Sequence, residues 1–531
     1  MSCRDALLWH LAACLPLLWS AAGCRSTPPA HQIRDPDFAR MESAIAETWY
    51  AQVPIDIQSP LAPDLAGPQP VETYIAHALV HNPDIHAARK RIEAAAMRVP
   101  QAASLQDPML EVNPYLVPMQ MGEMEQVMQL GVSQQIPWFG KLRSRAEAAE
   151  QETERARAEL AAAELAVIEQ VKIAYYELYF VQQALQITEA DRELLQGLLE
   201  IAAARFRVGQ VSQQDVLRAE LEVLDLENQL VQLQQELATA QARLARRLHL
   251  SPETPVRALE DLPAQQIPDD VHRLYDQAIA ARPELHAQLA DVIRERRNVD
   301  LARLDYLPDV RLSGMWMGMV MPDNGMNGSP DTDSAFLLGI GMNLPIYRKR
   351  LDAGVREAEA RVVASARQYD SLRDQTQEEV KDLFARVHSQ QELLRLMRDE
   401  IVPKADQTFE VSLQSYEVGE VSFLQLVDNW RQLLRFQIAT HRLEAQLRQS
   451  LARLERTIGG YLHADAAYRT IPQDAPARGT ARGTDTRARA GLSFRPSSLP
   501  QPRRTPPLPS ATARHQKDQP CSTDPFSQPP C

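Results

Sequence analysis

The sequence predicts a mainly α-helical protein with a small β part, built from long helical hairpins and four strands. Three observations support this fold class. Three short motifs occur twice in the same order, long stretches carry apolar residues at helical spacing, and each half of the chain contains two short segments of alternating apolar and polar residues. The aromatic content of only 6% fits helices that pack through small side chains.

The doubled motifs divide the chain into two repeats, which we place at residues 71–260 and 261–465. An internal duplication explains why the motifs keep the same order in both halves. In the first motif a proline begins a helix and an acidic residue follows in its first turn. The matching segments are 81–86 with 281–286, 133–137 with 341–345, and 207–212 with 417–422.

Each repeat is expected to contain a helix, two strands, a long helix and a shorter helix. Pro403 should kink the second long helix. Each long helix would extend on the order of 100 Å at 1.5 Å per residue, which is more than a globular core needs. The spacing predicts helices over 72–104, 140–207, 212–249, 271–305, 349–417 and 422–458, and strands over 109–120, 125–137, 309–320 and 335–346.

Apolar residues at helical spacing predict a buried stripe on the long and short hairpin helices. We expect this stripe to pack against neighbouring helices, although a coiled-coil scaffold would show the same spacing. Its members are Ile168, Val171, Tyr175 and Leu178 in the first long helix, and Leu217, Leu221, Leu224 and Leu230 in the helix that follows.

The strand segments alternate with a period of two, so each has one apolar face and one polar or small face. In the segment 128–133, for example, Met, Leu and Val alternate with Gln, Gly and Ser. Each segment has about the 9–11 residues that a tilted strand needs to cross a membrane. Four strands cannot close a barrel with a usable lumen, and open edges in lipid leave backbone groups unsatisfied, so the strands predict an oligomer. The alternative is a soluble hairpin packed on the helices.

The two ends of the chain lie outside the repeats. Residues 1–23 are typical of an export signal peptide, because Arg4 precedes a short apolar run that ends in small residues. The sequence at Cys24 is similar to a bacterial lipoprotein signal, which predicts a lipid anchor on this cysteine and transfer to the outer membrane. The alternative is secretory cleavage without a lipid. Residues 24–70 would form the lipidated N-terminus and a proline-rich spacer, and residues 466–531 a disordered, basic, proline-rich tail.

Composition and motifs exclude several classes of function. A formal charge of −13 argues against a nucleic-acid partner. No nucleotide-binding loop, nucleophile motif or catalytic carboxylate pair is recognisable, so we expect neither enzyme activity nor a cofactor. His81 and His86 are five residues apart and therefore do not share a face of a helix. They do not form a metal-binding motif.

The two repeats, the junction QQIPWFGKL at 134–142 and the paired Val-Gly turns resemble the TolC-type outer membrane factor family over residues 71–460. Its heavy-metal efflux lipoprotein branch is the candidate branch. The resemblance implies a homotrimer in which four strands per protomer contribute to a 12-stranded transmembrane β-barrel, with a helical barrel in the periplasm. It also implies two partners, a periplasmic adaptor (membrane fusion) protein and an inner-membrane efflux pump.

The Val-Gly turns have both a structural and a functional interpretation. Glycine provides the backbone freedom for a tight reversal, so the residues alone predict hairpin turns at Val208-Gly209 and Val418-Gly419. The resemblance implies that these turns form the periplasmic tip that contacts the adaptor. Both interpretations can hold together.

The resemblance also implies a periplasmic gate near that tip. Asp428 matches an aspartate that narrows the closed tip, and the companion acidic position is Gln425 in this chain. Asp215 and Tyr416 match residues that hold neighbouring hairpins together, whereas the arginine of that network is replaced by Val421. The residues alone favour solvated acids in first helical turns for Asp215 and Asp428.

A row of methionines alternates along one predicted strand. These methionines occupy the same alternate positions as Arg311 and Ser313 and so share their face of the strand. The thioethers therefore face the lumen if no bulge shifts the register. Soft sulfur suits Cu(I) or Ag(I), which makes these residues candidate metal contacts. The alternative is that methionine fills irregular apolar space. The residues are Met315, Met317, Met319 and Met321.

These observations predict the outer membrane channel of a tripartite efflux system. Such a channel passively conducts metal ions, drugs or polypeptides from the pump and adaptor to the exterior. The alternative is a periplasmic coiled-coil scaffold or adaptor protein without a pore.

Overall fold

A computed structural model describes residues 65, 67–121, 124–320 and 332–460. All of them belong to the unit Met1–Ala467, and the unit Tyr468–Cys531 lies outside the described residues. The first repeat contains α3 (Val71–His81), α4 (Pro83–Ala103), β2 (Met109–Met121), β3 (Met124–Ile136), α5 (Lys141–Arg207) and α6 (Gln213–Arg247). The second contains α7 (Val271–Ala281), α8 (Pro283–Leu304), β5 (Val310–Val320), β6 (Thr332–Met342), α9 (Arg348–Leu396), η2 (Met397–Ile401), α10 (Val402–Val418) and α11 (Phe423–Thr457).

The predicted mainly helical fold with a small β part is confirmed, with three corrections. Prolines divide two of the predicted helices, because Pro83 begins α4 and Pro283 begins α8. Asn82 caps α4, and its side-chain oxygen accepts a hydrogen bond from the Asp84 amide at 2.9 Å. The last predicted strand, 335–346, was placed too late: β6 spans Thr332–Met342. Pro345 has no N–H to donate to a strand ladder, so the pairing ends before it.

The second long helix is interrupted just before Pro403, in the region where a kink was predicted. Residues Met397–Ile401 form a single π-helical turn, η2, between α9 and α10. The Val402 amide donates to the Met397 carbonyl, one residue farther than in an α-helix. The interruption is therefore a wide turn that precedes the proline.

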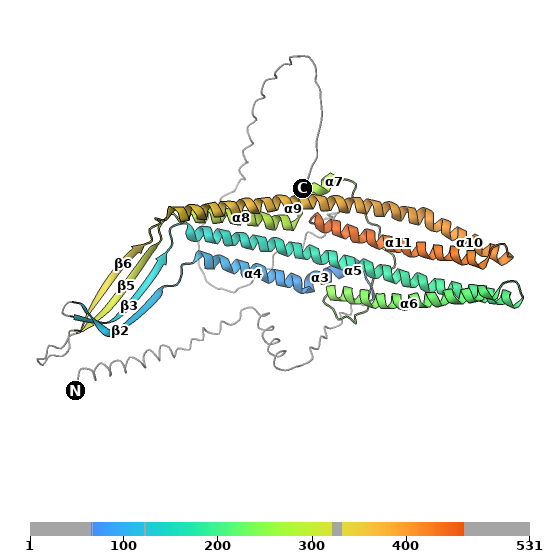
Figure 1. Cartoon of the computed structure of the whole chain (residues 1–531), viewed down its shortest axis with the longest axis horizontal. Coiled ribbons are helices and arrows are strands. Elements are labelled where there is room, and N and C mark those ends of the chain that lie inside the picture. The colour runs from blue at the N-terminus through green and yellow to red at the C-terminus, as the bar shows by residue number, and fades with distance from the viewer. Residues whose placement is uncertain (1–64, 66, 122–123, 321–331, 461–531) are drawn as a thin grey trace, which may run out of the picture. The chain divides into compact units, whose positions relative to one another are not determined.

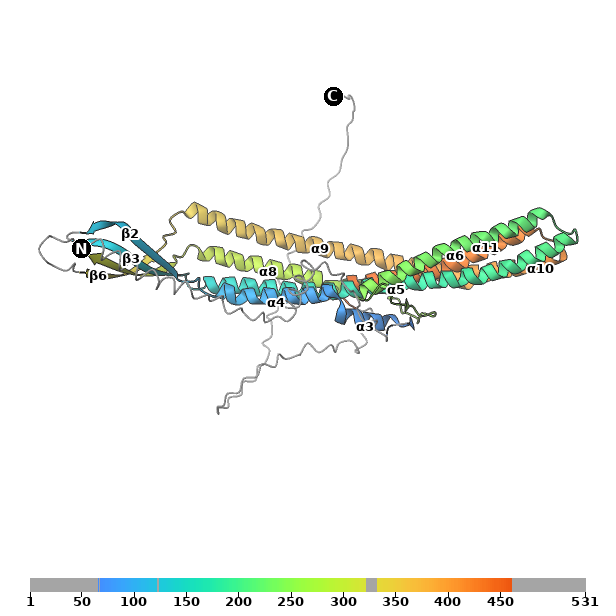
Figure 2. The same cartoon turned by 90° about the horizontal axis from the view of Figure 1, so that it is seen from below.

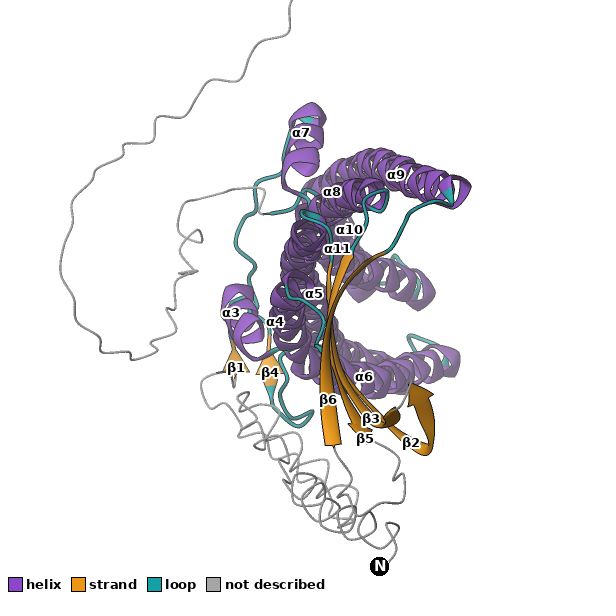
Figure 3. Cartoon of the chain, turned by 90° about the vertical axis from the view of Figure 1, so that its left-hand side faces the viewer, coloured by secondary structure: helices purple, strands orange, loops and turns teal. Residues whose placement is uncertain are grey.

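The strands and the hairpin turns lie at opposite ends of the helical body (Figures 1 and 2). The helices stand side by side in a curved layer when they are viewed from the sheet end (Figure 3). With 67 residues, α5 extends about 100 Å and reaches from the sheet to the hairpin turns. Among the described helices, none combines the length and apolar composition that crossing a membrane requires.

Ion pairs join the two repeats along α5 and α11. Arg442 pairs with Glu177 at 2.9 Å, and Arg456 pairs with Glu169 at 2.6 Å. A third pair, between Lys172 and Glu455, is largely buried. Buried pairs add little net stability, but breaking one is costly, so these contacts disfavour any other alignment of α11 on α5.

The predicted apolar stripe is only partly buried within one chain. Val171, Tyr175 and Leu178 of α5 lie in a core shared with α3, α6 and α11, and Leu230 of α6 is also buried. The prediction was wrong for the first half of α6, where three leucines are exposed and no described helix covers that face. The exposed residues are Leu217, Leu221 and Leu224.

A buried lysine connects the helical body to the sheet. Lys141, at the start of α5, is 3% exposed, and its Nζ lies 2.9 Å from Asp309 and 3.3 Å from Asp305. Asp309 also accepts a hydrogen bond from the Trp138 amide at 2.9 Å. Burial alone would raise the pKa of Asp309, but Lys141 and the Trp138 amide outweigh it and lower the pKa. The sheet therefore meets the helices through a fixed, ionised contact.

We predict that Gly459→Ala disrupts the end of α11. Gly459 has φ +78°, and a Cβ at this position would overlap the Ala281 carbonyl group, where α7 ends. The strain and the overlap together should lower the free energy of unfolding by about 2 kcal/mol or more. Denaturant unfolding monitored by circular dichroism measures the change. Gly460→Ala is the matched control, because nothing lies within 4 Å of a Cβ there; equal stability of the two variants would contradict the prediction.

Candidate functional site

The four-stranded sheet is antiparallel, in the order β2-β3-β5-β6. β2 pairs with β3 and β5 pairs with β6 as hairpins within each repeat. The pairing of β3 with β5 joins the two repeats. β2 and β6 are therefore edge strands, and each has one side unpaired within the single chain. The unpaired backbone groups of an edge strand favour pairing with another strand.

One face of this sheet is apolar and uncovered. On β6, Phe336, Leu338 and Ile340 are 80%, 88% and 78% exposed. In the strand register these residues lie opposite Trp316, Gly314 and Leu312 of β5. Water-exposed surfaces of soluble proteins seldom carry a contiguous apolar face, so this surface indicates contact with lipid or another protein.

The other face carries polar and small residues. Arg311 and Ser313 of β5 lie on it, next to Gln135 and Ser133 of β3. Glu111 and Asn113 of β2 continue the same face. The two faces of one sheet thus differ in the way that a strand between lipid and water requires.

The methionine row lies on the polar face. The pairing of β5 with β6 runs without a register shift from Val310 to Val320, so Met315, Met317 and Met319 keep the parity of Ser313. The irregularity beside the row is on β3, between Gln126 and Met128. Met321 lies outside the described residues.

A hydrogen-bonded chain of side chains crosses the polar face beside this row, and the sequence did not reveal it. Tyr115 donates to Gln129 Oε1 at 2.9 Å, and Gln129 Nε2 donates to the thioether sulfur of Met315 at 2.9 Å. These contacts depend on the register of the strands. The register becomes known only when β2 is paired with β3 and β3 with β5.

At the opposite end, both predicted reversals are glycine-terminated helix ends. Gly209 and Gly419 have φ +76° and +85°, the left-handed region that glycine accepts most readily. Val208 and Val418, which precede them, are 69% and 73% exposed. The two turns therefore present apolar side chains to the surroundings.

Asp215 lies in the first turn of α6, beside Tyr416. Its carboxylate accepts hydrogen bonds from the Ser212 amide at 3.2 Å and the Ser212 hydroxyl at 3.0 Å, which caps the helix. Burial raises the pKa of Tyr416; the Arg205 guanidinium opposes that rise and the Asp215 carboxylate adds to it. The Asp215 carboxylate therefore lies within electrostatic reach of the Tyr416 hydroxyl.

Arg205, which the sequence did not single out, connects the two hairpins at this point. It donates to the Tyr416 carbonyl at 2.6 Å and to the Glu417 carbonyl, at the C-terminal end of α10. Its guanidinium also lies 4.8 Å from the centre of the Tyr416 ring. A cation near a helix C-terminus and over an aromatic ring is favourable on both counts.

Asp428 and Gln425 are exposed on one face of α11, three residues apart. Asp428 lies 3.7 Å from Arg431, which also pairs with the buried Glu222 of α6. Asp428 therefore belongs to a second contact between hairpins, separate from the contact of Arg205 with Tyr416.

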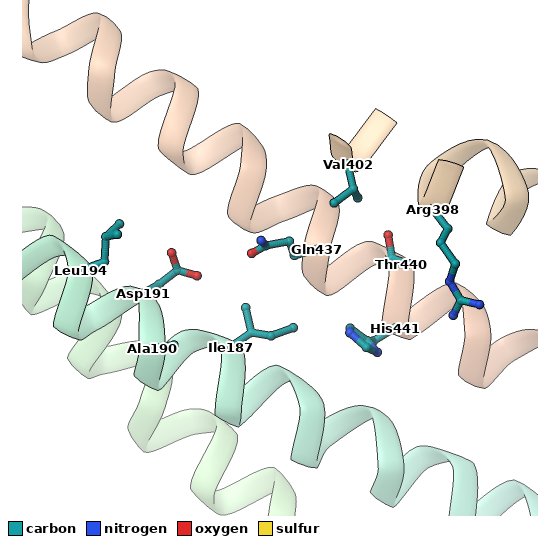
Figure 4. A pocket seen from close by; sticks show the side chains of 9 residues that line it. All are labelled: Ile187, Ala190, Asp191, Leu194, Arg398, Val402, Gln437, Thr440 and His441. Carbon is teal, nitrogen blue, oxygen red and sulfur yellow. The ribbon is translucent and has the colours of Figure 1, made fainter. Parts of the chain in front are cut away.

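A cavity of about 430 Å³ lies between α5, α11 and the η2 turn (Figure 4). Two of its charged lining groups are engaged with protein partners: Asp191 accepts from Trp430 at 2.7 Å, and Arg398 pairs with Glu444 at 3.0 Å. His441 bonds to the Tyr179 hydroxyl at 3.1 Å, and burial lowers the pKa of its imidazole. We interpret this region as a loosely packed joint beside the π-helical turn.

The remaining predicted site and the search for metal ligands add no further candidate ligand. Cys24 lies outside the described residues. Among the residues that the structure describes, no group of three or more His, Cys, Asp or Glu side chains is arranged to hold a metal ion.

The sequence matches a family model described as outer membrane efflux protein over residues 74–248 and 274–460, one segment in each half. It is 25% identical to Nodulation protein T of Rhizobium leguminosarum bv. trifolii, over 73% of this chain and 85% of the relative. It is 21% identical to the cobalt-zinc-cadmium resistance protein CzcC of Cupriavidus metallidurans, over 80% of this chain and 96% of that protein.

Among solved structures, the fold is similar to that of CusC, whose crystal structures concern folding and transmembrane channel formation. The TM-score is 0.63 at 19% sequence identity, and the match covers 75% of this chain and 93% of CusC.

Proposed function

The chain belongs to the outer membrane efflux protein family, and we propose that it forms the outer membrane channel of a tripartite efflux system. In this role it conducts cargo passively from an inner-membrane pump and a periplasmic adaptor to the exterior. The observation that carries the proposal is the sheet, which has one exposed apolar face, one polar face and two open edges.

Three copies would satisfy the open edges. A four-stranded sheet is too narrow to close on itself, whereas three such sheets give a barrel of 12 strands, with β6 of one copy beside β2 of the next. The same association would cover the exposed leucines of α6. In lipid every unpaired backbone group costs several kcal/mol, so closure is strongly favoured.

A periplasmic coiled-coil scaffold or adaptor would use the hairpins equally well. It would have no use for an apolar sheet face at the end of the helices, and for that reason we favour the channel. In this orientation the helical barrel lies in the periplasm, Cys24 carries a lipid anchor, and Val208 and Val418 meet the adaptor at the tip.

We predict that Cys24→Ala leaves the trimer in the outer membrane, because the barrel alone suffices to hold it there. Sucrose-gradient fractionation, followed by unheated gel electrophoresis of detergent extracts, measures location and oligomeric state. Wild type is the control, and mass spectrometry of its N-terminus tests the lipid separately. Recovery of Cys24→Ala as a soluble monomer would contradict the channel and favour the scaffold.

We also propose that Arg205 helps to hold the periplasmic gate closed in this chain. The family position for the gate arginine is Val421 here, and Arg205 reaches Tyr416 from the other repeat. Asp428 and Gln425 would line the narrowed tip, with one acidic side chain per protomer.

We predict that Arg205→Ala opens the gate more often. Loss of the cation–π contact and of the bonds to α10 should cost about 1–2 kcal/mol, which raises the open fraction by about 5- to 30-fold. Single-channel recording in planar bilayers measures it. Arg207→Ala is the matched control, since it removes an exposed arginine from the same helical turn. An unchanged open fraction in Arg205→Ala trimers would exclude this role.

For the cargo, we propose soft metal ions, Cu(I) or Ag(I). In the closed barrel the polar face becomes the lumen, and Met315, Met317 and Met319 would offer thioethers at successive positions along it. Drugs are the competing cargo, and methionine as a packing residue is the competing explanation for the row.

We predict that changing Met315, Met317, Met319 and Met321 together to leucine lowers copper or silver tolerance of cells that depend on this channel. Leucine keeps the apolar volume but removes the sulfur. Growth inhibition at graded metal concentrations and equal expression measures the effect. Met128→Leu with Met342→Leu is the control, because both lie on the apolar face. Equal tolerance of the row variant and wild type would exclude the role.

A further inference from the structure

Two histidines stand one turn apart on α3, close to the end of α6. His77 is half-buried and His81 is exposed. Their rings are stacked, with centroids 4.2 Å apart and an angle of 20° between the planes. Histidines four residues apart on a helix share one face and can bind the same ion. The sequence comparison of His81 with His86 missed this pair.

Backbone carbonyl groups orient both rings. His81 Nδ1 lies 3.0 Å from the His77 carbonyl oxygen. A carbonyl oxygen can only accept, so Nδ1–H of His81 donates to it, and Nε2 is the ring nitrogen left for a metal ion. Burial lowers the pKa of the His77 ring, and the nearby Leu248 carbonyl opposes that shift. Metal-binding histidines commonly donate their second N–H to a backbone carbonyl, which fixes the ligating nitrogen.

The two rings are close enough for their nitrogens to bind one ion. Two nitrogen ligands at about 2.0–2.1 Å in a tetrahedral shell are about 3.4 Å apart. Because the rings are stacked almost parallel, the outer ring must turn out of the stack to direct its lone pair at the same ion, and its exposure leaves room for that rotation.

The surroundings of the pair are also unusual. His249 follows α6 with φ 57°, and among the described residues it is the only one besides glycine with a positive φ. Its imidazole lies within electrostatic reach of His77. His249 is therefore a third imidazole near the pair, but the three are not arranged to hold one ion together.

We propose that His77 and His81 chelate one divalent transition-metal ion, such as Cu²⁺, Zn²⁺ or Co²⁺, with water molecules in the remaining positions. Neutral imidazole suits these ions, whereas the thioethers of the sheet suit monovalent soft ions. The site is independent of the proposed channel function, and it lies on the helical body rather than on the sheet.

The test is equilibrium dialysis of the full-length purified protein against ZnCl₂, with CuCl₂ and MnCl₂ as further probes. The protein carries no polyhistidine tag. All five cysteines are changed to serine in every sample so that thiols do not contribute: Cys3, Cys14, Cys24, Cys521 and Cys531. The variants are His77→Gln, His81→Ala and both together. The matched control is His86→Ala with His286→Ala, two histidines whose Nε2 atoms lie 2.8 and 2.9 Å from the carbonyls of Val80 and Ala280.

We expect one Zn²⁺ per chain in wild type and in the control. Each single variant should weaken binding on the order of 10- to 100-fold, and Cu²⁺ should bind more tightly and Mn²⁺ more weakly than Zn²⁺. Thermal unfolding tests whether the variants are folded. If His77→Gln is destabilised, the His81→Ala variant decides the result, because His81 is exposed and its replacement should not affect folding. The site is excluded if wild type binds no zinc, or if His81→Ala binds as tightly as wild type. Dialysis measures bound metal and not transport. Failure of the metal site would therefore leave the proposed channel function untouched, and failure of the channel function would leave the metal site untouched.

Discussion

The unpaired edges of β2 and β6 constrain everything else in the molecule. Each edge presents backbone donors and acceptors without partners, on a sheet whose apolar face is uncovered. Water could solvate the edges but not the apolar face, and lipid could cover the face but not the edges. The proposed association with further copies would satisfy both. It would also fit the curved layer of the helices (Figure 3) and cover the leucines left exposed on α6.

The duplication determines how the two ends are connected. Each repeat places its strand pair at one end and its hairpin turn at the other, so α5 spans the whole distance. The sheet end is fixed by Lys141, which is buried between two aspartates. Halfway along, the η2 turn and its cavity loosen the packing of α10 against α5 and α11. A firm contact at the sheet and looser packing toward the tip would let the tip move without disturbing the sheet.

The contacts at the tip join the two repeats through a guanidinium group. Arg205 stands at the C-terminal end of α5, donates to the Tyr416 carbonyl and lies over the Tyr416 ring. Arg205 donates to carbonyl groups at the C-terminal end of α10. The contact therefore depends on where that helix ends as well as on the residue type. Such a contact joins the repeats directly, as do the ion pairs between Arg431 and Glu222 and along α11.

The sequence by itself determined the class of fold, the doubled unit, the glycine turns and the two faces of the strands. These features are local: a period of two or of 3.6 residues, or a glycine, acts within a few positions of the chain. The tertiary structure decided what depends on pairing between distant segments. The register placed Gln129 against Met315, and hairpin packing brought Arg205 to Tyr416. The helix end at Leu248 came to lie beside His77. No local pattern encodes such contacts, because each depends on how far one element is displaced along another.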